Sequence, residues 1–237
     1  MTTFLVGSIL FLSAFTQSLS GFGLALVSMS LLPAVIGLRT ATPLVALAGV
    51  AIEVATLARY HEALEVRAIW RVVLAALAGI PIGVLWLSRV DERLALCVLG
   101  VVIGGYALYA LLGLRMPSLA HPVWAYLAGL AGGLLGGAYN TSGPPVIVYA
   151  DCRSWSREAF KGNLQGYFII ISLGVLLGHA VNGNLTAPVW SLFWWGLPFI
   201  AVGLLAGFSF DRWLRPEAFR RVVLVLLVVV GVRLVFS

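Results

Sequence analysis

The sequence predicts an all-α polytopic membrane protein, built from two repeats that each contain one broken or re-entrant segment and three transmembrane helices. Three observations predict this fold class. Hydrophobic residues make up 61% of the 237 residues and charged residues only 10%, whereas soluble chains carry roughly 25% charged residues. The apolar residues occur in runs long enough to span a bilayer as helices. Polar interruptions recur at matching places in the two halves, and we expect the repeats to be inverted.

Eight apolar runs, separated by short polar gaps, define the expected elements. Six have roughly the twenty residues that a simple membrane-spanning helix needs, and two are longer and interrupted. Stretches such as 222–232 are apolar on all sides, which favours helices over the alternating strands of a barrel. The runs are 3–36, 41–59, 70–88, 94–113, 122–150, 160–179, 189–210 and 218–235.

The two long runs are each broken by a polar, glycine-containing sequence. The run 3–36 breaks at Gln17-Ser-Leu-Ser-Gly-Phe-Gly23, and the run 122–150 breaks at Tyr139-Asn-Thr-Ser-Gly-Pro-Pro145. Each arm of the first run has about fourteen residues, or about 21 Å of helix, which is less than the roughly 30 Å of the hydrocarbon core. The sequence therefore predicts either two re-entrant hairpins or two kinked spanning helices.

The same order of features occurs in residues 1–115 and 116–237, which we expect to be an N-terminal and a C-terminal transmembrane repeat of one integral membrane unit. Small residues spaced by four allow membrane helices to approach closely, and each half has such a pair before a gap that contains arginines. The corresponding residues are Ser20-Gly21 and Ser142-Gly143, Gly79 with Gly83 and Gly203 with Gly207, and Arg89 with Arg93 and Arg212 with Arg215. The shared order predicts an internal duplication.

The distribution of Lys and Arg indicates an orientation, because cytoplasmic loops are enriched in these residues. The hairpin arrangement puts 4 of the 15 on one side (Arg39, Arg89, Arg93 and Arg233) and the remaining 11 on the other, and kinked helices give 5 and 10. Both arrangements place both termini outside the cytoplasm, and the hairpins require Arg67 to be inside. The positive charges lie in short loops rather than on a basic soluble surface, so no nucleic-acid partner is expected.

The two breaks form the expected substrate site. Non-helical backbone inside a bilayer is tolerated only where protein or a water-filled cavity satisfies its N–H and C=O groups. Helix arms that begin after the breaks would aim free N–H groups at a common point, and helix N-termini favour anions. The alternative interpretation is two packing kinks with satisfied polar groups. The candidate binding residues are Gln17, Ser18, Ser20, Gly21, Phe22, Gly23, Tyr139, Asn140, Thr141, Ser142, Gly143 and Asn163.

Two ionisable residues inside apolar runs are candidates for ion coupling. Glu53 lies in the run 41–59, where a carboxyl group is costly, and it either binds a coupling proton or cation or pairs with Arg59. Lys161 opens the run 160–179 and either faces the substrate or anchors the helix at the membrane boundary. The sequence has no catalytic or cofactor motif, and Cys97 and Cys152 have no metal-ligand or disulfide spacing. We therefore expect a protein that is not an enzyme and has no cofactor or metal.

Two motifs support a family resemblance. They are Ser20-Gly-Phe-Gly23, followed by an apolar helix, and Gly132-Gly-Leu-Leu-Gly-Gly-Ala-Tyr-Asn-Thr-Ser-Gly-Pro-Pro145. With these motifs, its length and its duplicated plan, essentially the whole chain resembles the sulfite exporter TauE/SafE family, also grouped as toluene sulfonate uptake permeases. The resemblance implies permeation of sulfite, sulfonates or related anions across a bacterial inner membrane. The candidate binding residues that it implies are Gly21, Gly23, Asn140, Ser142 and Gly143.

The sequence therefore predicts a secondary transporter that binds a small sulfur-containing anion, such as sulfite or an organosulfonate, between the two breaks near mid-membrane. The expected partners are this anion, a coupling proton or sodium ion, the lipid bilayer, and a second copy of the chain in a homodimer. A channel-like anion pore is the alternative function. A non-transporting membrane scaffold or enzyme subunit is the third hypothesis.

Overall fold

The computed structural model describes residues 2–113, 119, 121–153, 155–210 and 216–236. Its elements are helices throughout the described residues, and each expected apolar run forms one helix or a group of helices around a break. The helices are α1 (Thr2–Ser20), α2 (Leu24–Leu31), α3 (Pro33–Ile36), α4 (Leu38–Tyr60), η1 (His61–Ala63), α5 (Val66–Arg89), α6 (Glu92–Leu112), α7 (Val123–Tyr139), α8 (Gly143–Cys152), α9 (Arg157–Val181), α10 (Ala187–Phe210) and α11 (Pro216–Phe236). This architecture confirms the all-α fold class.

Several helices have the length and composition of membrane spans. Within the described residues, six are long and apolar enough to cross a bilayer, and these belong to α1, α4, α5, α6, α9 and α10. Large apolar side chains cover their outer surfaces, for example Leu177, which is 65% exposed, and Trp195, which is 66% exposed. Such a surface suits lipid rather than water. The chain is therefore a polytopic membrane protein.

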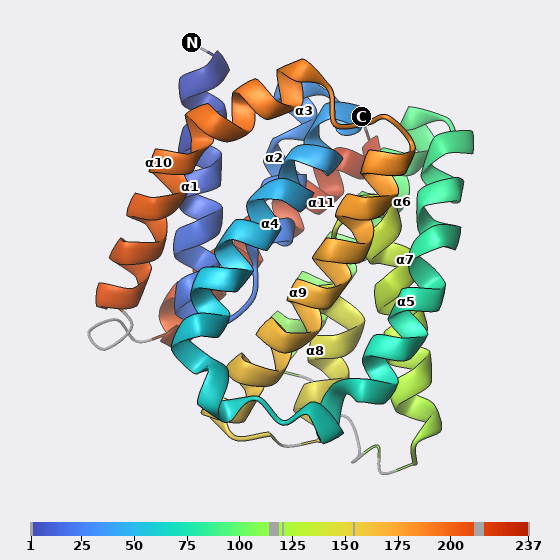
Figure 1. Cartoon of the computed structure of the whole chain (residues 1–237), viewed down its shortest axis with the longest axis vertical. Coiled ribbons are helices and arrows are strands. Elements are labelled where there is room, and N and C mark those ends of the chain that lie inside the picture. The colour runs from blue at the N-terminus through green and yellow to red at the C-terminus, as the bar shows by residue number, and fades with distance from the viewer. Residues whose placement is uncertain (1, 114–118, 120, 154, 211–215, 237) are drawn as a thin grey trace.

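The first broken run folds back on itself as a helical hairpin. Helix α1 ends at Ser20, and the backbone turns through Gly21 and Gly23, whose positive φ angles of 80° and 118° favour glycine. The Ser28 hydroxyl of α2 donates a hydrogen bond to the Ser13 hydroxyl of α1 at 2.8 Å, so residues on either side of the break lie side by side. Figure 1 shows α1 and α2 running in opposite directions.

The second broken run is also a hairpin. Asn140 ends α7 with a φ of 55°, a left-handed conformation that asparagine tolerates better than most residues. A Cβ at Gly132 of α7 would lie 3.1 Å from Val146 Cγ2 of α8, so the two arms pack against each other. Both broken runs are therefore hairpins rather than kinked spanning helices, and in Figure 1 they open towards opposite ends of the molecule.

Contacts between the two halves of the chain hold the bundle together. Helix α1 packs along α10, and α7 packs along α5. A Cβ at Gly79 of α5 would lie 2.6 Å from the Leu130 carbonyl oxygen, and one at Gly203 of α10 would lie 2.5 Å from the Phe11 carbonyl oxygen. These corresponding glycines thus allow close helix approach in both places. The division into repeats 1–115 and 116–237 stays a prediction.

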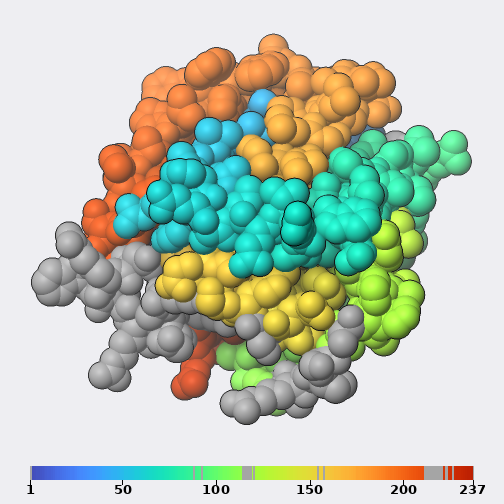
Figure 2. Space-filling view, turned by 60° about the horizontal axis from the view of Figure 1, so that its bottom comes forward, coloured from blue at the N-terminus to red at the C-terminus, as the bar shows by residue number. Residues whose placement is uncertain are grey.

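The connections lie at the two ends of the bundle. In Figure 1 the start of α1, the end of α11 and the α9–α10 turn share one end. The opposite end, brought forward in Figure 2, carries the connection from α4 to α5 beside α8 and the start of α9. There the Glu65 N–H donates to the Asn163 side-chain oxygen at 2.7 Å. Three arginines of the expected loops, Arg115, Arg212 and Arg215, lie outside the described residues.

Candidate functional site

The two breaks line one cavity in the middle of the bundle. It encloses about 30 Å³, which is space for roughly two water molecules. The first hairpin, the second hairpin, α4 and α9 all contribute to its wall. The residues around it are Gln17, Phe22, Gly23, Leu24, Ala25, Leu26, Val45, Gly49, Glu53, Asn140, Thr141, Ser142, Gly143, Ile147, Phe168 and Ser172.

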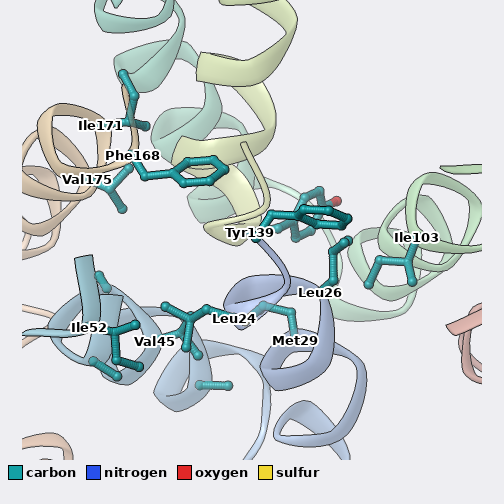
Figure 3. Packing of buried hydrophobic residues seen from close by; sticks show 14 of the residues in the cluster. Leu24, Leu26, Met29, Val45, Ile52, Ile103, Tyr139, Phe168, Ile171 and Val175 are labelled. Carbon is teal, nitrogen blue, oxygen red and sulfur yellow. The ribbon is translucent and has the colours of Figure 1, made fainter. Parts of the chain in front are cut away.

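Apolar side chains form a large part of this wall. Figure 3 shows Leu24 of α2, Val45 of α4 and Phe168 of α9, which come from three different helices and all border the cavity. Each of them is nearly inaccessible to solvent, with exposed fractions of 4%, 1% and 7%. The polar part of the wall therefore consists of the few polar atoms that the breaks, α4 and α9 supply.

A network of two glutamines satisfies the backbone of the first break. The Leu24 N–H donates to the Gln17 side-chain oxygen at 3.1 Å, and the Gln17 amide donates to the Gln165 side-chain oxygen at 3.2 Å. The Gln165 amide in turn donates to the Gly21 carbonyl oxygen at 2.6 Å. Buried backbone groups that leave a helix need such partners. Gln17 therefore has a structural role in addition to its place at the cavity.

The second break is tied to α4. The Asn140 side-chain amide donates to the Thr42 carbonyl oxygen, and the Thr141 hydroxyl donates to the Tyr139 carbonyl oxygen at 3.0 Å. Ser142 precedes α8 without a side-chain capping bond and is 5% exposed. Its hydroxyl is thus not used to cap the helix that it precedes.

The two helix starts supply main-chain donors unequally. The first N–H groups of an α-helix have no partner within the helix. At α2 the cavity-lining residues Ala25 and Leu26 occupy this first turn. At α8 the second and third residues are Pro144 and Pro145, which have no N–H group. The α2 start is therefore the richer source of main-chain donors for an anion.

The candidate residues fall into two groups by position. Those that line the cavity are Gln17, Phe22, Gly23, Asn140, Thr141, Ser142 and Gly143. The cavity wall, within the described residues, does not include Ser18, Ser20, Gly21, Tyr139, Asn163 and Lys161.

The second group has contacts elsewhere. The hydroxyls of Ser18 and Ser20 donate to carbonyl oxygens of α1 one turn earlier, at 3.0 and 2.7 Å. The Tyr139 ring packs edge-on against Trp86, with centroids 5.8 Å apart. The Asn163 side-chain oxygen accepts from the connection before α5. These contacts support the breaks and the helix ends.

Lys161 is buried near the start of α9, and its role as an anchor at the membrane boundary stays a prediction. It is 4% exposed, and its amine donates to the Tyr60 hydroxyl at 3.1 Å and lies 4.9 Å from the centre of that ring. Its side chain also packs on the first break, because a Cβ at Gly21 would lie 3.0 Å from Lys161 Cγ. The positively charged Lys161 side chain therefore lies against the turn of the first hairpin at Gly21 and against Tyr60.

Glu53 borders the cavity and does not pair with Arg59. Its Oε1 accepts a hydrogen bond from the Ser172 hydroxyl at 2.9 Å, and its Oε2 has no hydrogen-bond partner within the part of the chain that the structure describes. The Arg59 guanidinium lies 4.9 Å from the centre of the Phe208 ring instead. Of the two alternatives for Glu53, the pair with Arg59 is not formed, because the arginine packs on Phe208 of α10 instead.

Helix α9 contributes two cavity residues that sequence reasoning did not select, Phe168 and Ser172. Gln165 of the same helix, which opens the run 160–179, supports the first break. The three lie at i, i+3 and i+7, a spacing that puts them on one helix face. The sequence offered one indication that Ser172 belongs to the site, because its hydroxyl group lies in an otherwise apolar stretch.

Metal binding has no support within the part of the chain that the structure describes, where no three His, Cys, Asp or Glu side chains gather. The cavity wall combines apolar side chains with the polar groups of the breaks and one carboxyl group, Glu53.

The comparison with known families agrees with this architecture. The family model "Sulfite exporter TauE/SafE" matches residues 6–234, which include both hairpins and every helix that lines the cavity. No curated protein and no solved structure matches the chain. Because the match spans nearly the whole chain, the protein belongs to the sulfite exporter TauE/SafE family of membrane transporters.

Proposed function

We propose that the protein is a secondary transporter that moves a small sulfur-containing anion, such as sulfite or an organosulfonate, across the membrane. The observation that carries this proposal is the shared cavity, because residues of both breaks border it. Transporters often bind substrate near mid-membrane where helices are broken. Membership of a transporter family supports the same function. The protein acts without covalent chemistry and is not an enzyme.

The anion lies between the start of α2 and the second break. Main-chain N–H groups at Ala25 and Leu26, the Ser142 hydroxyl and the Asn140 side chain are the polar groups offered there. N–H groups at a helix start carry partial positive charge and suit an oxyanion. Phe22 and Phe168 give the same cavity an aromatic side, which accommodates the organic part of a sulfonate.

Alternating access requires the two halves of the chain to move against each other. The cavity lies where they meet, because Asn140 bonds to α4 across 98 positions of sequence and Gln17 bonds to Gln165 across 148. Movement of one hairpin with its supporting helices opens the cavity to one side. The inverted arrangement of two repeats supplies an equivalent opening to the other side.

The same proposal fixes an orientation in a bacterial inner membrane. The end of the bundle that carries Glu62 and Arg67 faces the cytoplasm, and both termini face outward. This assignment follows the excess of Lys and Arg on the cytoplasmic side. A second copy of the chain in a homodimer stays a prediction.

Flux into proteoliposomes tests the function. The expected result is saturable uptake of labelled sulfite or methanesulfonate, lowered at least tenfold by Ser142→Ala and by Asn140→Gly. Glycine at 140 keeps the left-handed backbone while it removes the side chain. Ser209→Ala is the matched control, because it removes an exposed hydroxyl from α10. Normal flux in both site variants contradicts the proposed site.

Two further outcomes discriminate the alternative functions. A channel-like anion pore gives single-channel currents in planar bilayers and flux that does not saturate with anion concentration. A membrane scaffold or enzyme subunit gives neither flux nor anion binding. Saturable flux without channel currents is the result that the proposal predicts.

A further inference from the structure

Glu53 is a buried carboxyl group in the wall of the cavity. It is 4% exposed, its Oε1 accepts from Ser172, and its Oε2 has no hydrogen-bond partner among the described residues. Of the sixteen residues that line the cavity, Glu53 is the one with an ionisable side chain. The group therefore shares a space of about 30 Å³ with the polar atoms of both breaks.

The helices packed against α4 do not neutralise this carboxyl group. Helices α1, α2, α3 and α10 contain no titratable side chain. On α9, Lys161 donates to the Tyr60 hydroxyl, and His179 bonds to Asn184 at the far end of the helix. Arg59, on α4 itself, lies over the Phe208 ring. The remaining titratable residues of α9 and η1 are Arg157, Glu158, Tyr167, His61 and Glu62.

An anion in the cavity conflicts with a charged Glu53. A carboxylate inside a membrane protein that no cation pairs with is costly. A second negative charge a few ångströms away raises that cost, because like charges in one site disfavour each other's ionised form. The conflict disappears when Glu53 carries a proton, since the neutral acid still accepts from Ser172 and gains an O–H donor on Oε2.

We infer that Glu53 is the proton-coupling site of the transporter: the cavity binds its anion only while Glu53 is protonated, so that one proton travels with each anion. This inference rests on the proposed function. The Glu53 carboxylate takes a proton from water on the side to which the cavity is open. The anion then binds beside the neutral acid. After the cavity opens to the other side, the anion leaves and the proton returns to water there.

A proton fits this position better than a sodium ion. Metal cations such as Na⁺ need several oxygen ligands around them, as the six or more oxygens around Ca²⁺ illustrate. The Ser172 hydroxyl is the group that Glu53 bonds to, and none of the other described residues that line the cavity carries a carboxyl group. A proton needs one oxygen, and Glu53 Oε2 provides it.

Binding measured against pH tests the inference directly. The probes are methanesulfonate and thiosulfate, because the charge of neither changes between pH 5 and pH 8. Sulfite is unsuitable here because it takes up a proton itself in this range. In the wild type the affinity falls by about tenfold for each pH unit above the pH at which Glu53 loses its proton. In Glu53→Gln, which resembles the neutral acid, the affinity stays constant with pH.

Glu62→Gln is the matched control, because it removes an exposed carboxyl group in η1, just after α4. It keeps the wild-type pH dependence. Equal wild-type affinity at pH 6 and pH 8 overturns the role of Glu53 and leaves the transporter intact. If neither probe binds the wild type at any pH, the proposed function fails, and the inference fails with it.

A second measurement needs no variant and so does not depend on the folding of Glu53→Gln. Wild-type proteoliposomes with a trapped pH indicator acidify inside when methanesulfonate enters, in sodium-free buffer. The expected ratio is one proton for each anion. Uptake that leaves the internal pH unchanged, or that requires sodium, overturns the inference.

Discussion

The Gln17 side-chain amide donates a hydrogen bond to the Gln165 side-chain oxygen at 3.2 Å, across 148 positions of sequence. Both side chains are almost completely buried, with exposed fractions of 2% and 0%. Together they satisfy the Leu24 N–H and the Gly21 carbonyl oxygen, which the break removes from regular helix. The first hairpin thus depends on α9 of the other half of the chain for its polar contacts.

Replacement of Gln165 by leucine is expected to destabilise the protein. The change removes the partners of the Gly21 carbonyl oxygen and the Gln17 amide, and a buried polar group without a partner costs about 1–3 kcal/mol. We expect a clear fall in the thermal unfolding midpoint in detergent. Asn182→Ala, which removes an exposed amide at the end of α9, leaves the midpoint within about a degree of the wild type. Equal midpoints for the two variants would show that the glutamine network has no role in stability.

Substitution of Gly79 by alanine tests the close contact between α5 and α7. A Cβ at this position would lie 2.6 Å from the Leu130 carbonyl oxygen, so the helices must separate. Overpacking of this kind typically costs about 1–3 kcal/mol. Gly105→Ala is the control, because a Cβ on this helical glycine meets nothing within 4 Å. A loss of stability at residue 79 but not at residue 105, measured by chemical or thermal unfolding, is the expected result, and similar losses at both count against the packing.

The left-handed backbone at Asn140 predicts an order of stability among variants. Both Asn140→Gly and Asn140→Ala lose the hydrogen bond to the Thr42 carbonyl oxygen. Alanine also has to adopt a φ of 55°, which costs roughly 1–2 kcal/mol for a residue with a Cβ. The alanine variant is therefore expected to unfold at a lower temperature than the glycine variant. The reverse order is incompatible with this backbone conformation.

Single cysteines test the arrangement of hairpins and spans. In a background without Cys97 and Cys152, a cysteine at exposed Asn182 is expected to react with an impermeant thiol reagent in intact cells. A cysteine at exposed Glu62 is expected to react only after the cells are opened. Asn182 follows the end of α9 and Glu62 lies in η1 after α4, and Figure 1 shows the end of α9 and the α4–α5 connection at opposite ends of the bundle. Labelling of both positions from the same side would rule out this topology.

The sequence predicts the elements well and the site only in part. Each apolar run became a helix or a group of helices because length and hydrophobicity alone decide whether a segment can cross a bilayer. The choice between hairpins and kinked helices depended on the contact between Ser13 and Ser28. The distribution of Lys and Arg in the sequence gives no information about that contact. Likewise, the partner of Glu53 lies 119 positions away at Ser172. The sequence left open whether Glu53 binds a coupling ion or pairs with Arg59, and it did not indicate Ser172.

The polar break residues were also predicted as one class, although they do different things. Asn140 and Ser142 border the cavity, whereas the Ser20 hydroxyl bonds back to its own helix at Thr16. Composition does not distinguish these cases, because the direction of each side chain depends on backbone angles at the turn. Three-dimensional contacts are required to separate residues that support a break from residues that face a ligand.

Thermal stabilisation by anions tests the central claim, that the cavity between the two breaks binds a sulfur-containing anion. Ligand at about 100 times its dissociation constant adds about 2.7 kcal/mol to stability. The account predicts that sulfite, thiosulfate or methanesulfonate raises the unfolding midpoint of the wild type and of Ser209→Ala, and that Ser142→Ala and Asn140→Gly lose most of this increase. An unchanged wild-type midpoint with every one of these anions, or an equal increase in both site variants, would contradict it.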